Sequence, residues 1–301
     1  MNIHLENVIL QSTSGPNHFA SKLVNKLQKL NVTTDSDLKP DARLCFIETY
    51  NNFSDNVPFF QRLDGIYFNT AQNYNQQNAN IKRTYEMSDG VIFQSHFNKE
   101  LITKYFGEHK NSTIIHNGAD LEYISEHPAL ENRSLDKFEN VWCCASSWRP
   151  HKRLNENIRY FLEHSGEKDC LVIAGSTQEK FFKNEKIFYV GTATVPQLIS
   201  LYKRSKYFLH LAWLDHCPNV VVDARAAGCQ IICSSAGGTK EIAGKDAVII
   251  SEDDWDFSPT MLYKPPKMDF SKTIKNQYDI DISISRAASQ YVSVFEGISK
   301  R

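Results

Sequence analysis

Two aspartates eight positions apart, Asp215 and Asp223, lie in the part of this sequence with the clearest chemical pattern. The segment 209–242, LHLAWLDHCPNVVVDARAAGCQIICSSAGGTKEI, predicts a strand, a loop, a helix, a second strand, a Gly-rich loop and the start of a further helix. Pro218 favours the first turn of the helix, whose backbone N–H groups and positive dipole end can hold a phosphate. Asp223 falls within this helix among apolar residues, where a buried carboxylate requires partners such as two adjacent ribose hydroxyls. The segment therefore predicts a site for a phosphorylated, hydroxyl-rich ligand.

Other residues of this segment allow two interpretations. On a purely structural interpretation, Asp215 is a helix cap and Asp223 a solvated helix position. Gly237 and Gly238 come between a strand and a helix, where glycine lets the backbone approach a sugar or phosphate, although a tight turn explains such a pair equally well. Glu241 is interpreted as a first-turn helix residue.

A basic group follows an earlier predicted strand in the sequence WRPHKRL, 148–154. Arg149, Lys152 and Arg153 would attract an anionic ligand if they lay beyond the strand end. The alternative is a solvated basic turn without a ligand.

These residues depend on elements predicted along the whole chain. Short runs rich in Val, Ile and Phe alternate with amphipathic helical patterns, which is typical of an α/β protein with parallel strands. In the first part we expect strands at 8–11, 44–47, 58–61, 91–94 and 113–115, and helices at 17–30, 75–86 and 98–106. In the second part we expect strands at 141–145, 171–174, 187–190, 207–211, 230–233 and 247–250, with helices between them.

The same pattern predicts two Rossmann-like domains facing across a cleft. Residues 1–122 are expected to form a small N-terminal domain, and the polar stretch 123–139 a linker. Residues 140–279 are expected to form the second domain. Residues 280–301 predict a C-terminal helix that returns to the first domain.

Composition excludes several classes of protein. Hydrophobic residues make up 41% of the 301-residue chain and charged residues 23%, as in ordinary globular proteins. A net charge of -1 supplies no broad positive field, so nucleic-acid binding is not expected. The seven cysteines lack zinc-site spacing and are interpreted as reduced core thiols. With no signal-peptide pattern and no membrane-spanning run, we expect a cytoplasmic protein without a transmembrane segment.

The order of the motifs resembles that of family 4 glycosyltransferases, retaining enzymes of the GT-B fold within glycosyl transferases group 1. The acidic pair, the Ala-rich helix and GGTKEI are similar to the family's nucleotide-sugar signature. ASSWRPHKRL (145–154) resembles the family's diphosphate-binding loop, and LVIAGS (171–176) and FYVGTATVPQLISLYKRSKYFLH (188–210) resemble the strand and base-binding turn that follow it. IIHNGAD (114–120) is similar to the interdomain segment, and SGPNHFASKLVNKL (14–27) to the first Gly-containing loop and helix.

The resemblance implies four catalytic side chains. Lys152 stands at the family's lysine, and Arg149 is interpreted as a substitute for the arginine usually found at the position of Ser147. Asp215 replaces a glutamate that holds sugar hydroxyls. Asp64 stands where the family has a histidine near the reacting carbon.

The resemblance also implies a set of donor-binding residues. The loop at Gly15 would close over the diphosphate, Asp223 would hold the ribose, and Leu198 would pack on the base beside Tyr189–Gly191. The full set is Gly15, Pro16, Ser147, Gly175, Tyr189, Val190, Gly191, Leu198, His216, Cys217, Pro218, Asn219, Val220, Asp223, Gly237 and Gly238.

The implied activity is that of a hexosyltransferase-like enzyme. It would move a sugar from a nucleoside-diphosphate sugar, UDP- or GDP-linked, to a glycan, lipid or other small-molecule acceptor with retention of configuration. Lys152, Arg149 and the helix N-terminus would stabilise the leaving diphosphate in place of a metal, so no metal and no separate cofactor are expected. The alternatives are a sugar-nucleotide epimerase of the same fold and a non-catalytic nucleotide-sugar or glycan-binding protein.

Overall fold

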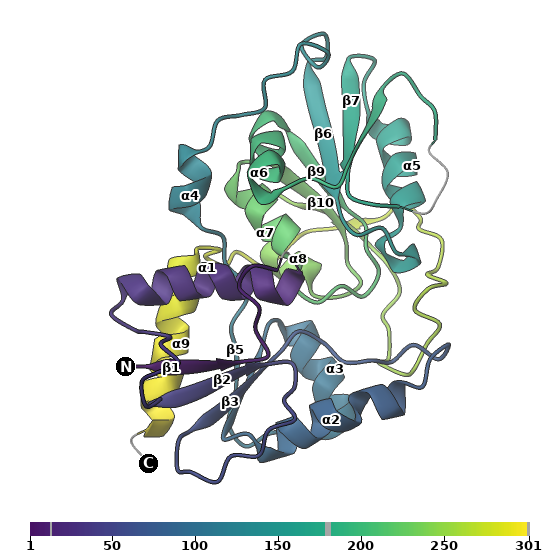
Figure 1. The fold of residues 1–301 in the computed structure, drawn as a ribbon. Helices are drawn as coiled ribbons and strands as arrows, with labels where there is room; N and C mark the ends of the chain where they lie inside the picture. Colours follow the sequence, from purple (N-terminus) through teal and green to yellow (C-terminus); the bar gives the residue numbers. More distant parts are fainter. Residues whose placement is uncertain (13, 178–181, 300–301) are drawn as a thin grey trace. The chain divides into compact units, whose positions relative to one another are not determined.

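The chain forms two sheets, each within its own compact unit. The computed structural model describes residues 1–12, 14–177 and 182–299, so positions 300 and 301 of the predicted C-terminal segment lie outside the described residues. Unit 1 consists of Met1–Asp120, Phe257–Thr260 and Asp281–Arg301, and unit 2 of Leu121–Asp256 and Met261–Ile280. Figure 1 follows the chain from the N-terminus to the C-terminus.

Unit 1 contains a five-stranded parallel sheet with its strands in sequence order. The strands are β1 (Ile3–Glu6), β2 (Ala42–Phe46), β3 (Phe59–Leu63), β4 (Gly90–Phe93) and β5 (Ser112–Ile114). The helices are α1 (Gly15–Lys29), α2 (Tyr74–Met87), α3 (His96–Phe106) and α9 (Ile284–Ser299). In Figure 1, α1 and α9 lie on one side of this sheet and α2 and α3 on the other.

The core of unit 1 explains why the C-terminal helix packs here. On α9, Tyr291 and Phe295 are fully buried. Their rings lie 6.2 Å from Phe19 of α1 and 5.1 Å from Phe60 of β3, respectively, measured between ring centroids. Burial of such aromatic rings dominates core energetics, so α9 belongs to the hydrophobic core of unit 1.

The expected first strand at 8–11 is wrong. The strand is β1, where Ile3 pairs with Ala42 in parallel register. Asn7 follows with φ at 58°, a left-handed conformation that ends the strand. Ile9, which lies in the wrongly predicted segment, is 62% exposed. The apolar run at 8–11 therefore belongs to the loop between β1 and α1.

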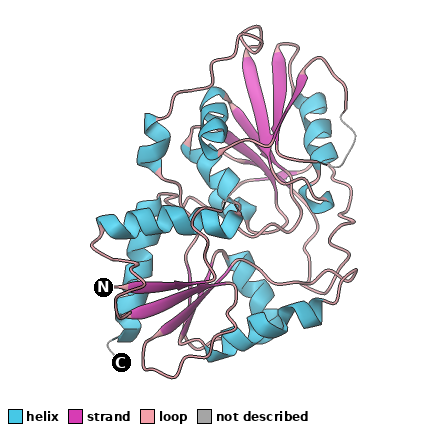
Figure 2. Ribbon diagram, in the orientation of Figure 1, coloured by secondary structure: helices cyan, strands magenta, loops and turns pink. Residues whose placement is uncertain are grey.

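Unit 2 contains a seven-stranded sheet in the order β12-β11-β10-β9-β6-β7-β8, parallel except for β12. Its strands are β6 (Asn140–Ala145), β7 (Asp169–Ala174), β8 (Ile187–Gly191), β9 (Tyr207–His210), β10 (Gln230–Ser234), β11 (Val248–Ile250) and β12 (Thr273–Ile274). Its helices are α4 (Leu121–Glu126), η1 (Pro150–Lys152), α5 (Leu154–His164), α6 (Val195–Arg204), α7 (Asn219–Ala226) and α8 (Thr239–Ile242). Figure 2 shows helices flanking this sheet, the arrangement of a doubly wound α/β unit.

Every residue of β7 is buried, as is all of β6 after its first residue. Strands covered on both faces are apolar almost throughout, which is why the sequence predicted them well. All seven cysteines are buried thiols. Within the described ranges, no helix is long and apolar enough to cross a membrane.

Candidate functional site

The loop after β7 contacts both the loop after β6 and the last residue of β8, at the carboxyl ends of these strands in unit 2. The Trp148 amide donates to the Ser176 carbonyl at 3.1 Å, and the Gly175 amide to the Gly191 carbonyl at 2.7 Å. Gly175 has φ at 107°, and a Cβ placed there would stand 1.8 Å from the Ser146 carbonyl oxygen. Only glycine fits this position, so Gly175 allows the loop after β6 to run against the loop after β7.

The loops after β9 and β10 form a second such pair. The Gly238 amide donates to the Asp215 carbonyl at 2.8 Å. Gly237 has φ at 101°, and a Cβ there would stand 2.6 Å from the same carbonyl oxygen. Leu214 has φ at 58°, a left-handed conformation that is costly for a residue with a side chain. The backbone around Asp215 is therefore held in place by the glycine loop beside it.

Lys152, in the loop after β6, contacts Asp215, in the loop after β9. The Lys152 Nζ lies 2.5 Å from Asp215 Oδ2, and the His210 Nε2 lies 2.8 Å from the same oxygen. The side chains of Lys152 and Asp215 are 19% and 13% exposed, and that of His210 is 4% exposed. Two residues predicted to be catalytic, 63 positions apart, thus form a charged pair whose side chains are still partly exposed to solvent.

Sequence reasoning missed His210. It is the last residue of β9, at the carboxyl end of an otherwise apolar strand, YFLH. The ends of parallel strands are where ligand-binding side chains gather in such sheets, so this position was a signal that could have been used.

Burial and neighbouring charges set the charge state of this cluster. Burial alone would raise the pKa of Asp215, but Lys152 and His210 hold that pKa well below its ordinary value. Burial lowers the pKa of His210, although Asp215 opposes the shift. It also lowers the pKa of His216 to about 4 and that of His151 to about 3. At neutral pH these three imidazoles are uncharged, and the Asp215 carboxylate faces the Lys152 ammonium.

Helix α7 begins beside this charged pair. Pro218 occupies the N-cap and offers no side-chain acceptor. The Val221 and Val222 amides donate to the Pro218 carbonyl at 3.1 and 3.3 Å, so the helical hydrogen bonds begin there. The backbone amide of His216, three residues before α7 begins, donates to Asp215 Oδ1 at 3.0 Å. Lys152 therefore contacts the loop that leads into α7. Cys217 lies in this loop, and Asn219 and Val220 are the first two residues of the helix.

Asp223 lies within α7, as the sequence predicted, and is 6% exposed. Its charge acts on the buried hydroxyl of Tyr202 on α6, whose pKa burial and neighbouring groups raise well above the ordinary value. Gly228 follows the helix with φ at 100°, a common way for a helix to end.

The three cations of the basic turn lie in three different environments. Arg149 and Ser147 are exposed, and the Arg149 amide donates to the Ser147 carbonyl at 2.9 Å. Lys152 is paired with Asp215, and Arg153 is buried. The alternative of a wholly solvated basic turn is therefore wrong, because only Arg149 is exposed among the three cations.

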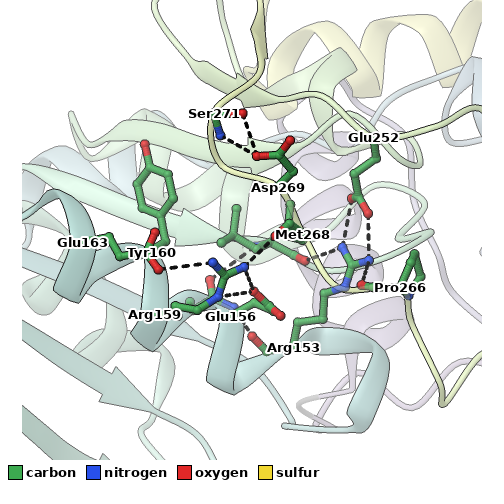
Figure 3. Close-up of polar contacts among 12 residues, drawn as sticks. Arg153, Glu156, Arg159, Tyr160, Glu163, Glu252, Pro266, Met268, Asp269 and Ser271 are labelled. Carbon is green, nitrogen blue, oxygen red and sulfur yellow. Dashed lines mark hydrogen bonds and ion pairs between the residues drawn. The ribbon is translucent and has the colours of Figure 1, made fainter.

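Arg153 has a structural partner instead. Its Nη1 and Nη2 donate to both Glu252 carboxylate oxygens at 2.9 and 2.7 Å, and Nη2 also donates to the Pro266 carbonyl at 2.8 Å. Figure 3 shows this contact beside a second arginine, Arg159, which donates to the Met268 carbonyl at 2.7 Å. Together they hold the segment after β11 against α5 and its N-cap residue.

The residues predicted to bind the base lie on β8 and α6. Val190 is 52% exposed near the end of β8, and Leu198 is half-buried on α6. The Tyr189 hydroxyl accepts a hydrogen bond from the Phe182 amide at 3.0 Å. Of these positions, Gly191 is joined directly to the loop cluster through its bond from Gly175.

Asp64, Gly15 and Pro16 belong to unit 1. Asp64 follows β3 and forms an ion pair with Arg62, whose Nη2 also donates to Asn117 Oδ1 at 2.7 Å. Burial raises the pKa of Asp64 against the opposing effect of Arg62. Gly15 and Pro16 open α1, and a Cβ built on Gly15 would have no described atom within 4 Å apart from its chain neighbours and the backbone of its own helix.

Comparison with known proteins shows which protein family part of this chain matches. Residues 131–257, less than half of the chain, match the family model of glycosyl transferases group 1. A search of curated proteins found no match to the sequence. Within the described ranges, no three His, Cys, Asp or Glu side chains are grouped so as to hold a metal ion.

Several solved structures are similar over nearly the whole chain. Sucrose-phosphate synthase from Thermosynechococcus elongatus has a TM-score of 0.69 at 12% identity, covering 99% of this chain and 98% of that chain. Anabaena Alr3699/HepE in complex with UDP-glucose has a TM-score of 0.61 at 13% identity, covering 100% and 98%. The UDP-forming α,α-trehalose-phosphate synthase from Burkholderia xenovorans has a TM-score of 0.58 at 14% identity, covering 93% and 78%.

The class that these findings define is the GT-B fold, with two Rossmann-like domains, and the predicted fold class is confirmed. Residues 131–257 carry the glycosyl transferases group 1 match, and the protein is accordingly a glycosyltransferase. The epimerase and binding-protein alternatives are not favoured.

Proposed function

We propose that this protein transfers a sugar from a UDP- or GDP-sugar to a glycan, lipid or other small-molecule acceptor, with retention of configuration and without a metal. The observation that carries the proposal is the 2.5 Å contact between Lys152 Nζ and Asp215 Oδ2, in the loop that leads into α7. A flexible cation thus contacts the loop that precedes a helix N-terminus, a combination suited to a diphosphate.

Negative charge that develops on the leaving group is the main contribution to the reaction barrier that the proposed site would lower. As the anomeric bond breaks, the departing nucleoside diphosphate gains negative charge, which preorganised donors stabilise. The Lys152 ammonium, the exposed Arg149 guanidinium and the first amides of α7 are proposed to supply those donors. In this arrangement the protein itself does the work that a divalent cation does in other sugar-transfer sites.

The carboxylates are proposed to hold the donor's hydroxyl groups. Asp215 is ionised and acts only as an acceptor, so it suits hydroxyls of the transferred sugar. Asp223 is proposed to accept from the ribose. Asp64 and the loop at Gly15 belong to unit 1, and the roles expected for them at the reacting carbon and at the diphosphate stay predictions.

Retention is proposed to follow from attack on the same face as the leaving group. The leaving phosphate takes the proton of the acceptor hydroxyl, so no strong protein base is needed. Anomeric configuration in the isolated product, read by proton NMR, tests this part of the proposal. An inverted product would overturn it without affecting the donor site.

Nucleotide binding gives the most direct test of the donor site. UDP or GDP, or the corresponding sugar, should raise the melting temperature, because a ligand at 100 times its Kd stabilises the folded state by about 2.7 kcal/mol. Lys152→Ala should remove most of this shift and most of the slow release of nucleoside diphosphate without acceptor. The matched control is Lys168→Ala, which removes a cation that is 68% exposed and paired with Glu139.

Two outcomes would contradict the proposal. One is the absence of any shift with either nucleotide or its sugars. The other is a shift and a release rate that Lys152→Ala leaves at the level of the Lys168→Ala control. Metal independence is tested separately: release should be the same after treatment with EDTA and after addition of Mg²⁺ or Mn²⁺.

A further inference from the structure

We propose that His210 is a positioning residue for Asp215, holding the carboxylate in place when Lys152 exchanges its contact with that carboxylate for the diphosphate of the donor. The proposal deepens the proposed function and rests on it, since it assumes that Lys152 binds the donor. It starts from a shared atom, because Asp215 Oδ2 contacts both the Lys152 amine and the His210 imidazole.

The two partners of Asp215 Oδ2 differ in the conformational freedom of their side chains. Lys152 ends a four-carbon stem with freely rotating donors, and its side chain is 19% exposed, so it can turn to another anion. His210 is 4% exposed, and its backbone pairs with Cys233 of β10 in the sheet. The imidazole has two side-chain torsions and a buried, fixed backbone. Its 2.8 Å contact with Asp215 therefore remains when the lysine leaves.

The direction of this hydrogen bond follows from the charges. An ionised carboxylate only accepts, so the His210 ring nitrogen facing it carries the proton. Burial keeps the imidazole neutral, which fixes the tautomer with the proton on Nε2. A neutral donor suits this role because it orients the carboxylate without competing with Lys152 for the phosphate.

The remaining groups that face Asp215 do not replace this contact. The His216 backbone amide holds the other oxygen, Oδ1, at 3.0 Å. The charge of Asp215 acts to raise the pKa of His151, on η1, against the effect of burial. The structure gives the His151 side chain no hydrogen bond to that carboxylate. The side chains whose charges act on Asp215 are thus Lys152 and His210, and Asp215 in turn acts on His151 and His216. Among them, His210 alone pairs a buried side chain with a hydrogen bond to the shared oxygen.

Two substitutions at one position separate this role from simple packing. His210→Leu removes the donor, whereas His210→Gln keeps an N–H group in reach of Asp215 without a titratable ring. With the donor that is turned over, His210→Leu should lower kcat/KM by about tenfold or more, as expected for loss of a hydrogen bond to a charged group. His210→Gln should recover most of that loss.

The pH profile supplies a readout that packing alone would not move. The His210 hydrogen bond favours the ionised form of Asp215, so removing it should shift the acid limb of kcat/KM to higher pH. His210→Gln should return the limb toward its original position. His109→Leu is the control, because His109 lies in unit 1 and its ring nitrogens contact the Asn111 and Ser88 carbonyls.

A measurement without donor keeps the two proposals distinguishable. The carboxyl carbon of Asp215, assigned in NMR spectra with Asp215→Asn, should titrate at higher pH in His210→Leu than in the wild type and in His210→Gln. An unchanged titration and acid limb in a folded His210→Leu protein would overturn the positioning role, as would a failure of His210→Gln to restore either. If the wild type turned over no sugar nucleotide, the proposed function would fail, and the NMR titration would still decide whether His210 controls Asp215.

Discussion

The Lys152 amine and the Asp215 carboxylate lie 2.5 Å apart although 63 residues separate them in the chain, and Asp215 is also bonded to buried His210. The pair joins the loop after β6 to the loop after β9, two strands that are neighbours in the sheet. Without a ligand, Asp215 is the counter-ion of Lys152. A ligand anion would compete with Asp215 for this cation.

Asp215→Asn should separate the charge of this residue from its shape. The amide keeps the size of the side chain but loses the ionised acceptor, which faces Lys152. We expect kcat/KM for the donor to fall by about tenfold to a hundredfold, the usual cost of losing a charged hydrogen bond. Steady-state rates of diphosphate release measure this, and a variant as active as the wild type would remove Asp215 from the proposed site.

Gly237→Ala should damage the site through the backbone. A Cβ at Gly237 would stand 2.6 Å from the Asp215 carbonyl oxygen, at φ of 101°. Gly228→Ala is a matched control, since Gly228 has φ of 100° and its added Cβ would meet no described atom within 4 Å. Both variants should lose about 1 kcal/mol through the unfavourable φ. Gly237→Ala should lose more in urea unfolding and should also lose donor release, and equal behaviour of the two would contradict the close-approach argument.

Acid should lower the stability of the folded protein at pH values well above those at which carboxyl groups ordinarily titrate. The folded pKa values of His216 and His151 fall from 6.5 to about 4 and about 3, so between these values and 6.5 the unfolded chain binds more protons. Stability is therefore lost as pH drops from 6.5 toward 4. Asp215, whose folded pKa is also lowered, adds to the loss at still lower pH. The melting temperature measured at constant ionic strength should follow this course, and His216→Asn should flatten it.

Breaking the Arg153–Glu252 ion pair should cost more than breaking a surface pair. Their side chains are 1% and 7% exposed, so Arg153→Ala leaves a buried carboxylate with fewer partners. We expect the free energy of unfolding to fall by about 3 to 5 kcal/mol. Lys168→Ala breaks an exposed pair with Glu139 and should leave stability unchanged within error. Chemical unfolding of both variants provides the comparison, and a similar result for the two would contradict the buried role of Arg153.

Local patterns in the sequence predicted most elements. The segment 209–242 was predicted as strand, loop, helix, strand and Gly-rich loop, and the structure has β9, α7, β10 and α8 there. Burial on both faces makes such strands continuously apolar, and Pro218 and Gly228 mark the ends of the helix between them, so each signal lies within a few residues of the element it predicts.

Other features depended on contacts between distant segments. Nothing local distinguishes 8–11 from 3–6 as the first strand; pairing with Ala42–Cys45 decides it. Residues 257–260 belong to unit 1 because the Thr260 amide donates to the Phe68 carbonyl at 3.0 Å, a partner far away in the chain.

The sequence by itself determined the α/β class, the fold class that the comparisons confirm, and the loops in which the candidate site residues lie, because periodicity and turn residues act over short distances. Only the tertiary structure decided the partners of two adjacent cations: Lys152 contacts Asp215, whereas Arg153 is buried and contacts Glu252. It also brought His210 to the carboxylate of Asp215. The physical reason is that a side chain's charge state and partner depend on which strand ends the sheet places side by side, and that order is set by the packing of the whole unit.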